Sequence, residues 1–299
     1  MNKLIIMEWN INQRTRRNGK EQEIPEWIVD EIVSKEPKPH IIVLTEFYKA
    51  KNWLNIVKGL DEYNVFFTDN NMEHQNDVLI AVKKELRVKQ IKDIQSTYEN
   101  DNPNFLRVDI EVLHNKVISV IGVRIRTRNY GKEPKRDDFS SDKDYNEACS
   151  EWKQDFIREE KWRRKQNDII LNHVKKVETP TIIVGDFNNF RRTYVDDIWC
   201  IKEVQELYES NNYTWNHIDG SSIYNETSGF AEDHIITKEL SATNQRYSRD
   251  FAMVSGREEA YPKGKDFREV NVPNPDHAIL KAIIEFDEGN EMKENNSFD

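Results

Sequence analysis

The sequence predicts a layered α/β sandwich, with β-sheets inside and helices outside. Short apolar runs typical of strands outnumber helical segments, and the helical segments fall between them. No Gly/Ser-rich linker, internal repeat or low-complexity segment divides the chain. With 299 residues, of which 37% are hydrophobic, the chain is long enough to close one good core. We expect a single domain over residues 1–286 and an acidic, disordered tail at 287–299, which has little to bury.

The strands are expected where short runs rich in Ile, Leu and Val end at polar residues or turns. The runs LIIMEWNI and HIIVLTEF are nearly continuous, as in buried strands, whereas DVLIAVK and RVDIEVL alternate in part, as half-exposed antiparallel strands do. The expected strands are residues 4–11, 40–47, 63–68, 77–83, 107–113, 116–126, 179–189, 233–240, 251–256 and 277–286.

Helices are expected at 24–35, around 53–60, at 151–177 and at 201–208. The first has a mostly apolar face and is stopped by prolines 37 and 39, and the third is long, with Trp152 and Phe156 on its apolar face. Residues 127–148 are polar and lack apolar periodicity, which indicates a loop or insertion. Such loops diversify among related proteins, so this one is expected to influence specificity.

Composition favours a cytoplasmic protein without a membrane partner. The N-terminal apolar run is short and broken by Glu8, unlike a signal peptide, and no stretch approaches the roughly 18 apolar residues of a membrane span. The two cysteines, 149 and 200, do not make a disulfide framework. The formal net charge of −10 argues against a broad nucleic-acid-binding face, although binding needs only a local basic patch.

Several expected strands deliver an Asn, Asp, Glu or His at one end. An acid at the rim of a rigid sheet is held firmly, as a metal or catalytic site requires. A single residue of this kind is most often a polar strand end that meets solvent, but the repetition weakens that explanation. The residues are Asn10, Glu46, Asp186, Asn188, Asp276 and His277.

These residue types point to phosphate chemistry. Carboxylate and amide oxygens suit hard cations such as Mg²⁺, Mn²⁺ or Ca²⁺, and no Cys/His cluster of the zinc type occurs. A cation held in this way polarises a phosphoryl oxygen and stabilises the leaving group. A histidine beside the carboxylates can take a proton from water or hold the phosphate, provided that an acid fixes its tautomer. We expect magnesium or manganese as the cofactor.

Four short motifs carry a resemblance to a known family: WN at 9–10, LTE at 44–46, GDFN at 185–188 and DH at 276–277. In this order and spacing the chain resembles the endonuclease/exonuclease/phosphatase superfamily, which includes exonuclease III-like and DNase I-like enzymes. The resemblance extends from residue 4 to about residue 286, and the run that begins at Asp233 is similar to the family's IDYI strand. It implies a four-layer α/β/β/α sandwich, in which two mostly antiparallel sheets pack together between helices, and metal-dependent hydrolysis of phosphate esters.

The resemblance also implies which residues form the metal site. Glu46 would be the main ligand, with Asn10 beside it, and Asp276 would be a further acid at the site.

The catalytic roles follow from the resemblance in the same way. Asp186 would orient or activate the attacking water, and Asn188 would bind the phosphate or help to place that water. His277 would contact the scissile phosphate or act as acid and base, with Asp233 hydrogen-bonded to its imidazole.

One departure from the family pattern is Arg124, which stands where many relatives have a His or Tyr near the phosphate. An arginine can bind phosphate with two hydrogen bonds, but it cannot donate a proton as a histidine does.

Basic residues are concentrated directly after the strands that carry the site. If the strand ends converge, these residues surround the site with positive charge and attract a polyanion such as DNA or RNA. The expected substrate-binding residues are Arg14, Arg124, Arg126 and Arg191.

Three functions remain open from the sequence. The leading hypothesis is a metal-dependent nuclease that hydrolyses DNA or RNA by in-line attack of water. The alternative is a phosphatase or phosphodiesterase acting on a small substrate, such as an inositol phosphate or a phospholipid headgroup, because the fold does not decide the substrate. The third is a binding module with an inactive site.

Overall fold

The computed structural model of the protein describes most of the chain. The described residues are 3–11, 26–47, 53–68, 77–95, 103–113, 116–127, 133–188, 201–223, 231–253, 275 and 277–286.

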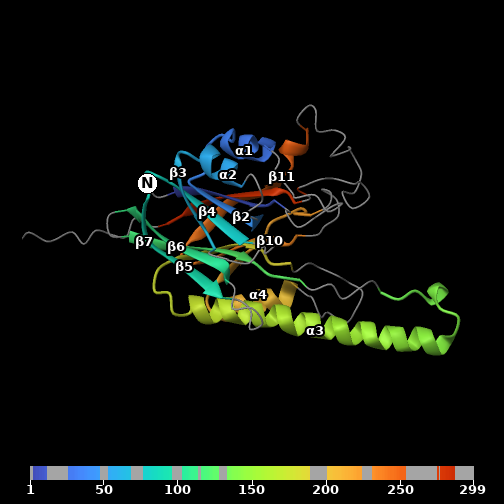
Figure 1. Ribbon diagram of the computed structural model, residues 1–299. Coiled ribbons are helices and arrows are strands. Elements are labelled where there is room, and N and C mark those ends of the chain that lie inside the picture. The colour runs from blue at the N-terminus through green and yellow to red at the C-terminus, as the bar shows by residue number, and fades with distance from the viewer. Residues whose placement is uncertain are drawn as a thin grey trace, which may run out of the picture.

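Two six-stranded mixed sheets form the centre of the molecule (Figure 1). In the order of the first sheet, the strands are β11 (Ser241–Ser248), β12 (Ile279–Glu285), β1 (Lys3–Asn10), β2 (Ile41–Phe47), β4 (Asp77–Lys83) and β3 (Tyr63–Phe67). In the second sheet they are β5 (Arg87–Gln95), β6 (Pro103–Leu113), β7 (Lys116–Arg124), β8 (Thr181–Asp186), β10 (Asp233–Lys238) and β9 (Thr214–Asn216). Only the β1–β2 and β7–β8 pairs are parallel, as expected for mostly antiparallel sheets.

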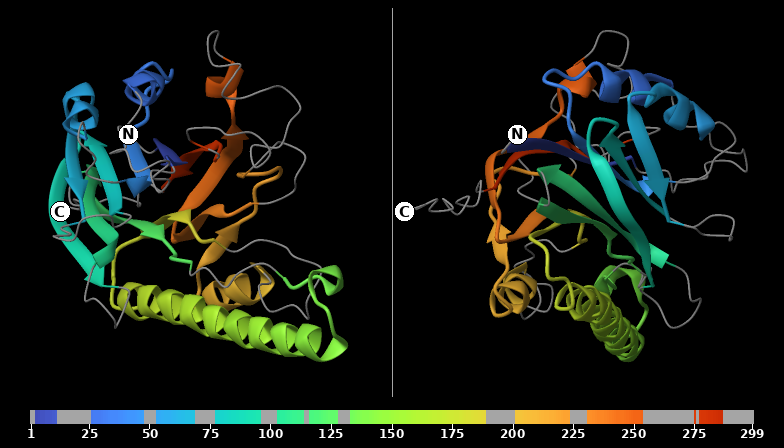
Figure 2. Two further views of the ribbon diagram at one scale, coloured as in Figure 1. Left: turned by 45° about the vertical axis from the view of Figure 1, so that its right-hand side comes forward. Right: turned by 90° about the vertical axis from the view of Figure 1, so that its left-hand side faces the viewer.

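Helices cover the outer face of each sheet. The helices α1 (Glu26–Val33) and α2 (Leu54–Gly59) lie on the first sheet, and α3 (Asp142–Val174) and α4 (Ile201–Glu209) lie on the second (Figure 2). Two short 3₁₀ helices, η1 (Arg136–Asp138) and η2 (Asp250–Met253), complete the described elements. The four-layer α/β/β/α sandwich expected from the sequence is confirmed.

Three hydrophobic clusters hold these layers together, because each strand alternates its side chains between the two faces of its sheet. On β1, Leu4 and Ile6 pack between the two sheets, whereas Met7 and Trp9 pack under α1 and α2. A third cluster packs the outer face of the second sheet against α3 and α4. All described residues belong to these layers or their connections, and none of the described helices combines the length and hydrophobicity needed to cross a membrane.

The long helix α3 begins nine residues earlier than expected, at Asp142, so the prediction of a loop up to residue 148 is wrong from residue 142 onward. The Ser141 side chain accepts a hydrogen bond from the Asp144 backbone amide at 3.2 Å and caps the first turn. This part of the helix is mostly exposed and extends beyond the strand ends in Figure 1. A solvent-exposed turn needs no apolar stripe, which is why hydrophobic periodicity did not reveal it.

The sequence also predicted a strand at 251–256, and its described part, 251–253, is instead in the 3₁₀ helix η2. Phe251 packs on Trp9, with ring centroids 5.0 Å apart, and belongs to the hydrophobic cluster under α1. Strands β5, β9 and β11 were not expected. The two longer ones, β5 and β11, contain register shifts and many polar residues, which break the period of two on which strand prediction depends.

Candidate active site

The strand ends that carry the predicted residues meet at one edge of the sandwich. In the first sheet, β1 and β2 are parallel, so Asn10 lies opposite Thr45 and next to the end that carries Glu46. In the second sheet, Asp186 at the end of β8 lies opposite Arg124 of β7 and Asp233 of β10. Side chains from both sheets therefore reach the same rim, as the sequence predicted.

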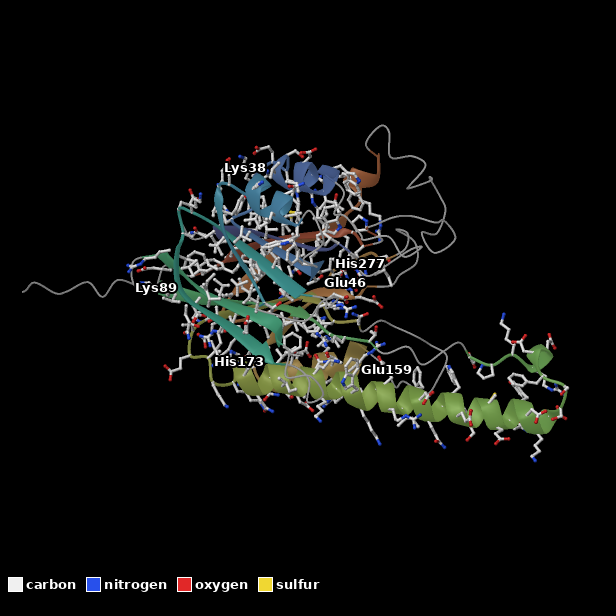
Figure 3. All side chains as sticks on the ribbon, in the orientation of Figure 1. Lys38, Glu46, Lys89, Glu159, His173 and His277 are labelled. Atoms are coloured by element: carbon white, nitrogen blue, oxygen red, sulfur yellow. The ribbon has the colours of Figure 1, made fainter. Side chains whose placement is uncertain are left out.

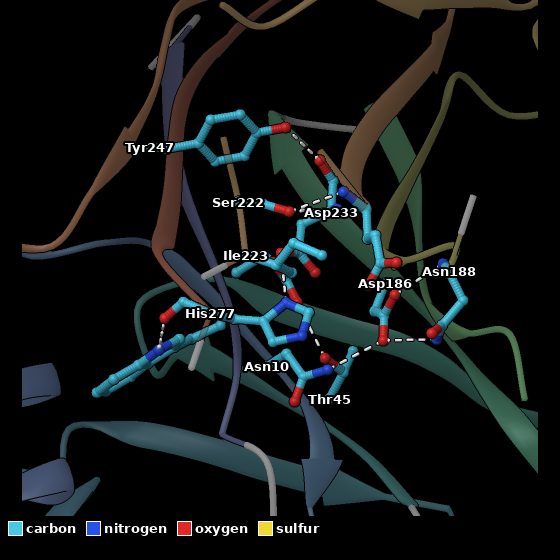
Figure 4. Close-up of polar contacts among 12 residues, drawn as sticks. Asn10, Thr45, Asp186, Asn188, Ser222, Ile223, Asp233, Tyr247 and His277 are labelled. Carbon is cyan, nitrogen blue, oxygen red and sulfur yellow. Dashed lines mark hydrogen bonds and ion pairs between the residues drawn. The ribbon is translucent and has the colours of Figure 1, made fainter. Parts of the chain in front are cut away.

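Asp186 is buried and held from three directions (Figure 4). Asn10 donates from its side-chain amide to Oδ2 at 2.9 Å, which joins the two sheets. Asn188 donates from its backbone N–H to Oδ1 at 2.7 Å and from its side-chain Nδ2 to Oδ2 at 2.7 Å. Hydrogen bonds to both oxygens fix the orientation of the carboxylate.

The turn after β8 has the backbone conformation that this arrangement requires. Asn188 has φ of 50°, in the left-handed region that Asn tolerates better than most residues. At Gly185, φ is 146° and a Cβ atom would lie 1.9 Å from the carbonyl oxygen of Val123. Gly185 is therefore needed where β8 passes β7, immediately before the functional side chains.

His277 and Asp233 form the second cross-sheet contact, with 2.8 Å between Nδ1 and Oδ2. Both residues are buried, and the backbone around them is fixed: the indole of Trp9 donates to the His277 carbonyl at 3.1 Å, and Tyr247 donates its hydroxyl to the Asp233 carbonyl at 2.6 Å. An acid that engages Nδ1 sets the tautomer and the orientation of the imidazole ring.

Glu46 and Arg124 form the third cross-sheet contact, with Nη2 at 2.5 Å and Nε at 3.2 Å from the same carboxylate oxygen. The predicted metal ligand and the predicted phosphate-binding arginine are therefore ion-paired with each other. Arg124 is 1% exposed and lies 3.9 Å from Asp186 as well. Its Nη1 is buried and makes no hydrogen bond within the described part of the chain, so one face of the guanidinium retains donor capacity.

Two further acids of the site, Glu8 and Glu232, were not predicted. Glu8 is fully buried and accepts a hydrogen bond from the Thr45 hydroxyl at 3.0 Å; burial, with the nearby charge of Asp233, raises its pKa well above the usual range. Burial and the charge of Asp186 raise the pKa of Glu232 to about 8. Glu8 could have been found, because it interrupts an apolar strand two residues before Asn10 and so faces the same side.

The site gathers five buried carboxyl groups. They belong to Glu8, Glu46, Asp186, Glu232 and Asp233, and each residue is 7% exposed or less. The raised pKa values of Glu8 and Glu232 favour the protonated forms of these two groups. Arg124 contacts Glu46, and His277 contacts Asp233. A divalent cation would offset the charge of acids gathered in this way.

The donor types also fit such a cation. In the described ranges, no three Asp, Glu, His or Cys side chains are grouped so that they could hold a metal by themselves. Mg²⁺ does not need such a group, because it commonly keeps several waters and binds one or two carboxylates together with substrate phosphate. Glu46 and the amide oxygen of Asn10 are the donors at the rim that would hold it.

Of the remaining predicted residues, only Arg126 lies among the described residues. Arg126 exchanges two hydrogen bonds with the Gln166 side chain through its backbone, at 2.9 and 3.0 Å, immediately after β7. Asp276, Arg14 and Arg191 lie outside the described residues.

Known proteins resemble the chain in structure but not in sequence. No protein-family model and no curated protein matches its sequence. Solved structures match over the full length. A functionally unknown conserved protein from Enterococcus faecalis is 12% identical with a TM-score of 0.62, covering 95% of this chain and 100% of that one. TDP2 from D. rerio, crystallised with a single-strand DNA product, is 12% identical with a TM-score of 0.61, covering 95% and 99%.

An endonuclease/exonuclease/phosphatase from Bacteroides vulgatus is 11% identical with a TM-score of 0.61, covering 96% of this chain and 100% of that one. At this level of identity the likeness concerns the fold. The fold implied by the sequence motifs is therefore confirmed.

Proposed function

We propose that this chain, which has the fold of the endonuclease/exonuclease/phosphatase proteins, is a divalent-metal-dependent phosphodiesterase that hydrolyses DNA or RNA. The observation that carries the proposal is the convergence, at one rim, of a His277–Asp233 pair and an Asp186 carboxylate clamped by Asn10 and Asn188. A histidine with a fixed tautomer and an oriented carboxylate can serve as the general acid and general base in the hydrolysis of a phosphate ester.

Each group at the rim has a distinct task in this proposal. Asp186, held in a fixed orientation by its amide donors, orients the attacking water and accepts its proton. His277, held through Nδ1 by Asp233, would act on the scissile phosphate, and Asp233 would stabilise the imidazolium. Arg124, with Nη1 uncommitted in the described part of the chain, donates to a phosphate oxygen. A divalent cation bound by Glu46 and Asn10 would supply Lewis-acid stabilisation of the developing charge.

Two observations favour a nucleic acid as the substrate. Basic residues follow the site strands in sequence, at 14, 16 and 17, at 124 and 126, and at 191 and 192. The D. rerio TDP2 structure with the same fold contains a single-strand DNA product. Both observations favour a polyanion over a small phosphorylated substrate.

The test compares cleavage of supercoiled plasmid, end-labelled single-stranded DNA and RNA in Mg²⁺, Mn²⁺ or EDTA. The wild type is expected to cut with metal and not with EDTA. Asp186→Asn and His277→Gln are expected to lose at least about 100-fold in rate, since each removes a proton-transfer group.

Matched control variants exclude a contaminating nuclease. Asp168→Asn changes an exposed acid on α3, and His173→Gln changes a histidine at the far end of α3 from the rim (Figure 3). Both should cut like the wild type. If nucleic acids stay intact while phosphate is released from a panel of small esters, the substrate part of the proposal is wrong. If neither reaction occurs, the proposed activity is wrong.

A further inference from the structure

A polar stripe on the long helix α3 faces the site. Glu159, Arg163 and Gln166 are spaced by four and three residues, so they lie on one face of the helix. All three side chains are buried, at 1%, 5% and 0% exposure. On most surface helices, residues of these types are exposed to solvent. One turn further on, the same face becomes apolar with Ile170 and packs on the second sheet.

Arg163 connects this stripe to the turn after β8. Its Nε donates to the Glu159 carboxylate at 2.9 Å, and its Nη1 donates to the backbone carbonyl of Asn188. Glu159 therefore holds the guanidinium in the orientation in which it reaches the turn. Gln166 binds both backbone groups of Arg126 and so holds the segment after β7 in the same way.

Asn188 is the residue through which this contact reaches the chemistry. Its φ of 50° is a conformation that persists only when its surroundings support it. Its carbonyl is bound by Arg163, while its N–H and side-chain amide bind the two oxygens of Asp186. Its Nδ2 also donates to the Ile125 carbonyl at 2.8 Å, so the residue is fixed at both ends.

We propose that Arg163 is a positioning residue of this site: by binding the Asn188 carbonyl, it holds the Asn188 amide groups on Asp186 and so keeps that carboxylate oriented. The functional part of this inference rests on the proposed phosphodiesterase activity. Because Arg163 acts through Asn188, its loss should lower the rate of the chemical step and leave substrate binding largely intact.

The test replaces Arg163 by Gln and by Lys, with Arg164→Gln as the control. Arg164 is the next residue on α3, but it is exposed and pairs only loosely with Asp168, at 3.7 Å. Because Arg163→Gln leaves the buried Glu159 carboxylate without its partner, the double variant Glu159→Gln with Arg163→Gln is measured beside it; it removes the pair as a neutral unit. Two quantities are recorded: kcat and KM on the best nucleic-acid substrate, and amide hydrogen exchange of residues 185–188.

Both Arg163→Gln and the double variant are expected to lower kcat by about 10- to 100-fold with KM changed less than threefold, and to speed exchange at 185–188. Arg163→Lys keeps the charge, but its single ammonium cannot serve Glu159 and Asn188 in the same geometry, so it should recover only part of kcat. The inference is overturned if the folded variants match Arg164→Gln in kcat, or in exchange at 185–188. If the wild type hydrolyses nothing, the proposed function fails, and the exchange comparison alone then decides whether Arg163 holds the turn.

Discussion

Glu46→Gln and Arg124→Gln, singly and together, test the charge pair that joins the two sheets at the rim. The pair is almost completely buried, with side-chain exposures of 6% and 1%, and two guanidinium nitrogens contact one carboxylate oxygen. Removing one partner of such a pair leaves the other charge buried without a counter-ion, which typically lowers the unfolding free energy by about 3–5 kcal/mol. Replacing both partners by uncharged groups often changes the unfolding free energy little.

The structure decides which single change is worse. After Glu46→Gln, Arg124 still has Asp186 at 3.9 Å, so the loss in unfolding free energy should be near the lower end, about 3 kcal/mol. After Arg124→Gln, Glu46 and Asp186 both lose the guanidinium beside them, so a loss of about 4–5 kcal/mol is expected. The double variant should lose less than either single variant, because neither member of the Glu46–Arg124 pair is left as an isolated charge and Asp186 keeps its donors from Asn10 and Asn188.

The assay is urea unfolding at equilibrium in EDTA at pH 7, followed by tryptophan fluorescence. The slope of unfolding free energy against urea must be the same for all four proteins, since a changed slope signals a changed denatured state and invalidates the comparison. The reasoning is refuted if the losses of the two single variants add up in the double variant, because additivity would mean that the two side chains do not interact.

Three further predictions concern the proton-transfer pair and two buried titratable groups. Asp233→Asn should reduce kcat by about 10²- to 10⁴-fold, and Asp233→Asn combined with His277→Gln should be hardly slower than His277→Gln alone, because the two act as a unit; multiplicative losses in steady-state kinetics would contradict this. Burial, reinforced by the charge of Asp186, raises the pKa of Glu232 from 4.5 to about 8, so the folded chain binds more protons than the unfolded chain between these values and its stability falls as pH rises through them. Glu232→Gln should therefore gain about 1 kcal/mol or more at pH 9 and almost nothing at pH 4.5 in urea unfolding, and an equal effect at both pH values would rule the explanation out. Burial, with the nearby charge of Arg107, lowers the pKa of His173 from 6.5 to about 4, so stability is lost as pH falls from 6.5 towards 4; His173→Gln should flatten that loss in melting temperature, and an unchanged pH profile would show that His173 is not responsible.

Much of the fold follows from local patterns that the sequence contains. The runs that became β1, β2 and β4 are short and apolar over most of their length, and each end is marked by a polar residue or turn. The same runs located Asn10 and Glu46, because a polar residue at the end of a buried strand is visible without knowing what it faces. Where the pattern was broken by register shifts, as in β5 and β11, or was unnecessary, as in the exposed start of α3, the sequence misled.

Only the tertiary structure decided how the polar residues are paired. Asn10 and Asp186 are 176 residues apart in the chain, and Glu46 and Arg124 are 78 apart, yet each pair forms one hydrogen-bonded contact across the two sheets. Hydrophobic periodicity reports which face of a strand is buried, but not which strand of the other sheet lies opposite. For this reason the sequence could predict Glu46 and Arg124 as candidate site residues, whereas the packing of the two sheets decided that they bind each other, and that Arg163 reaches the turn that holds Asp186.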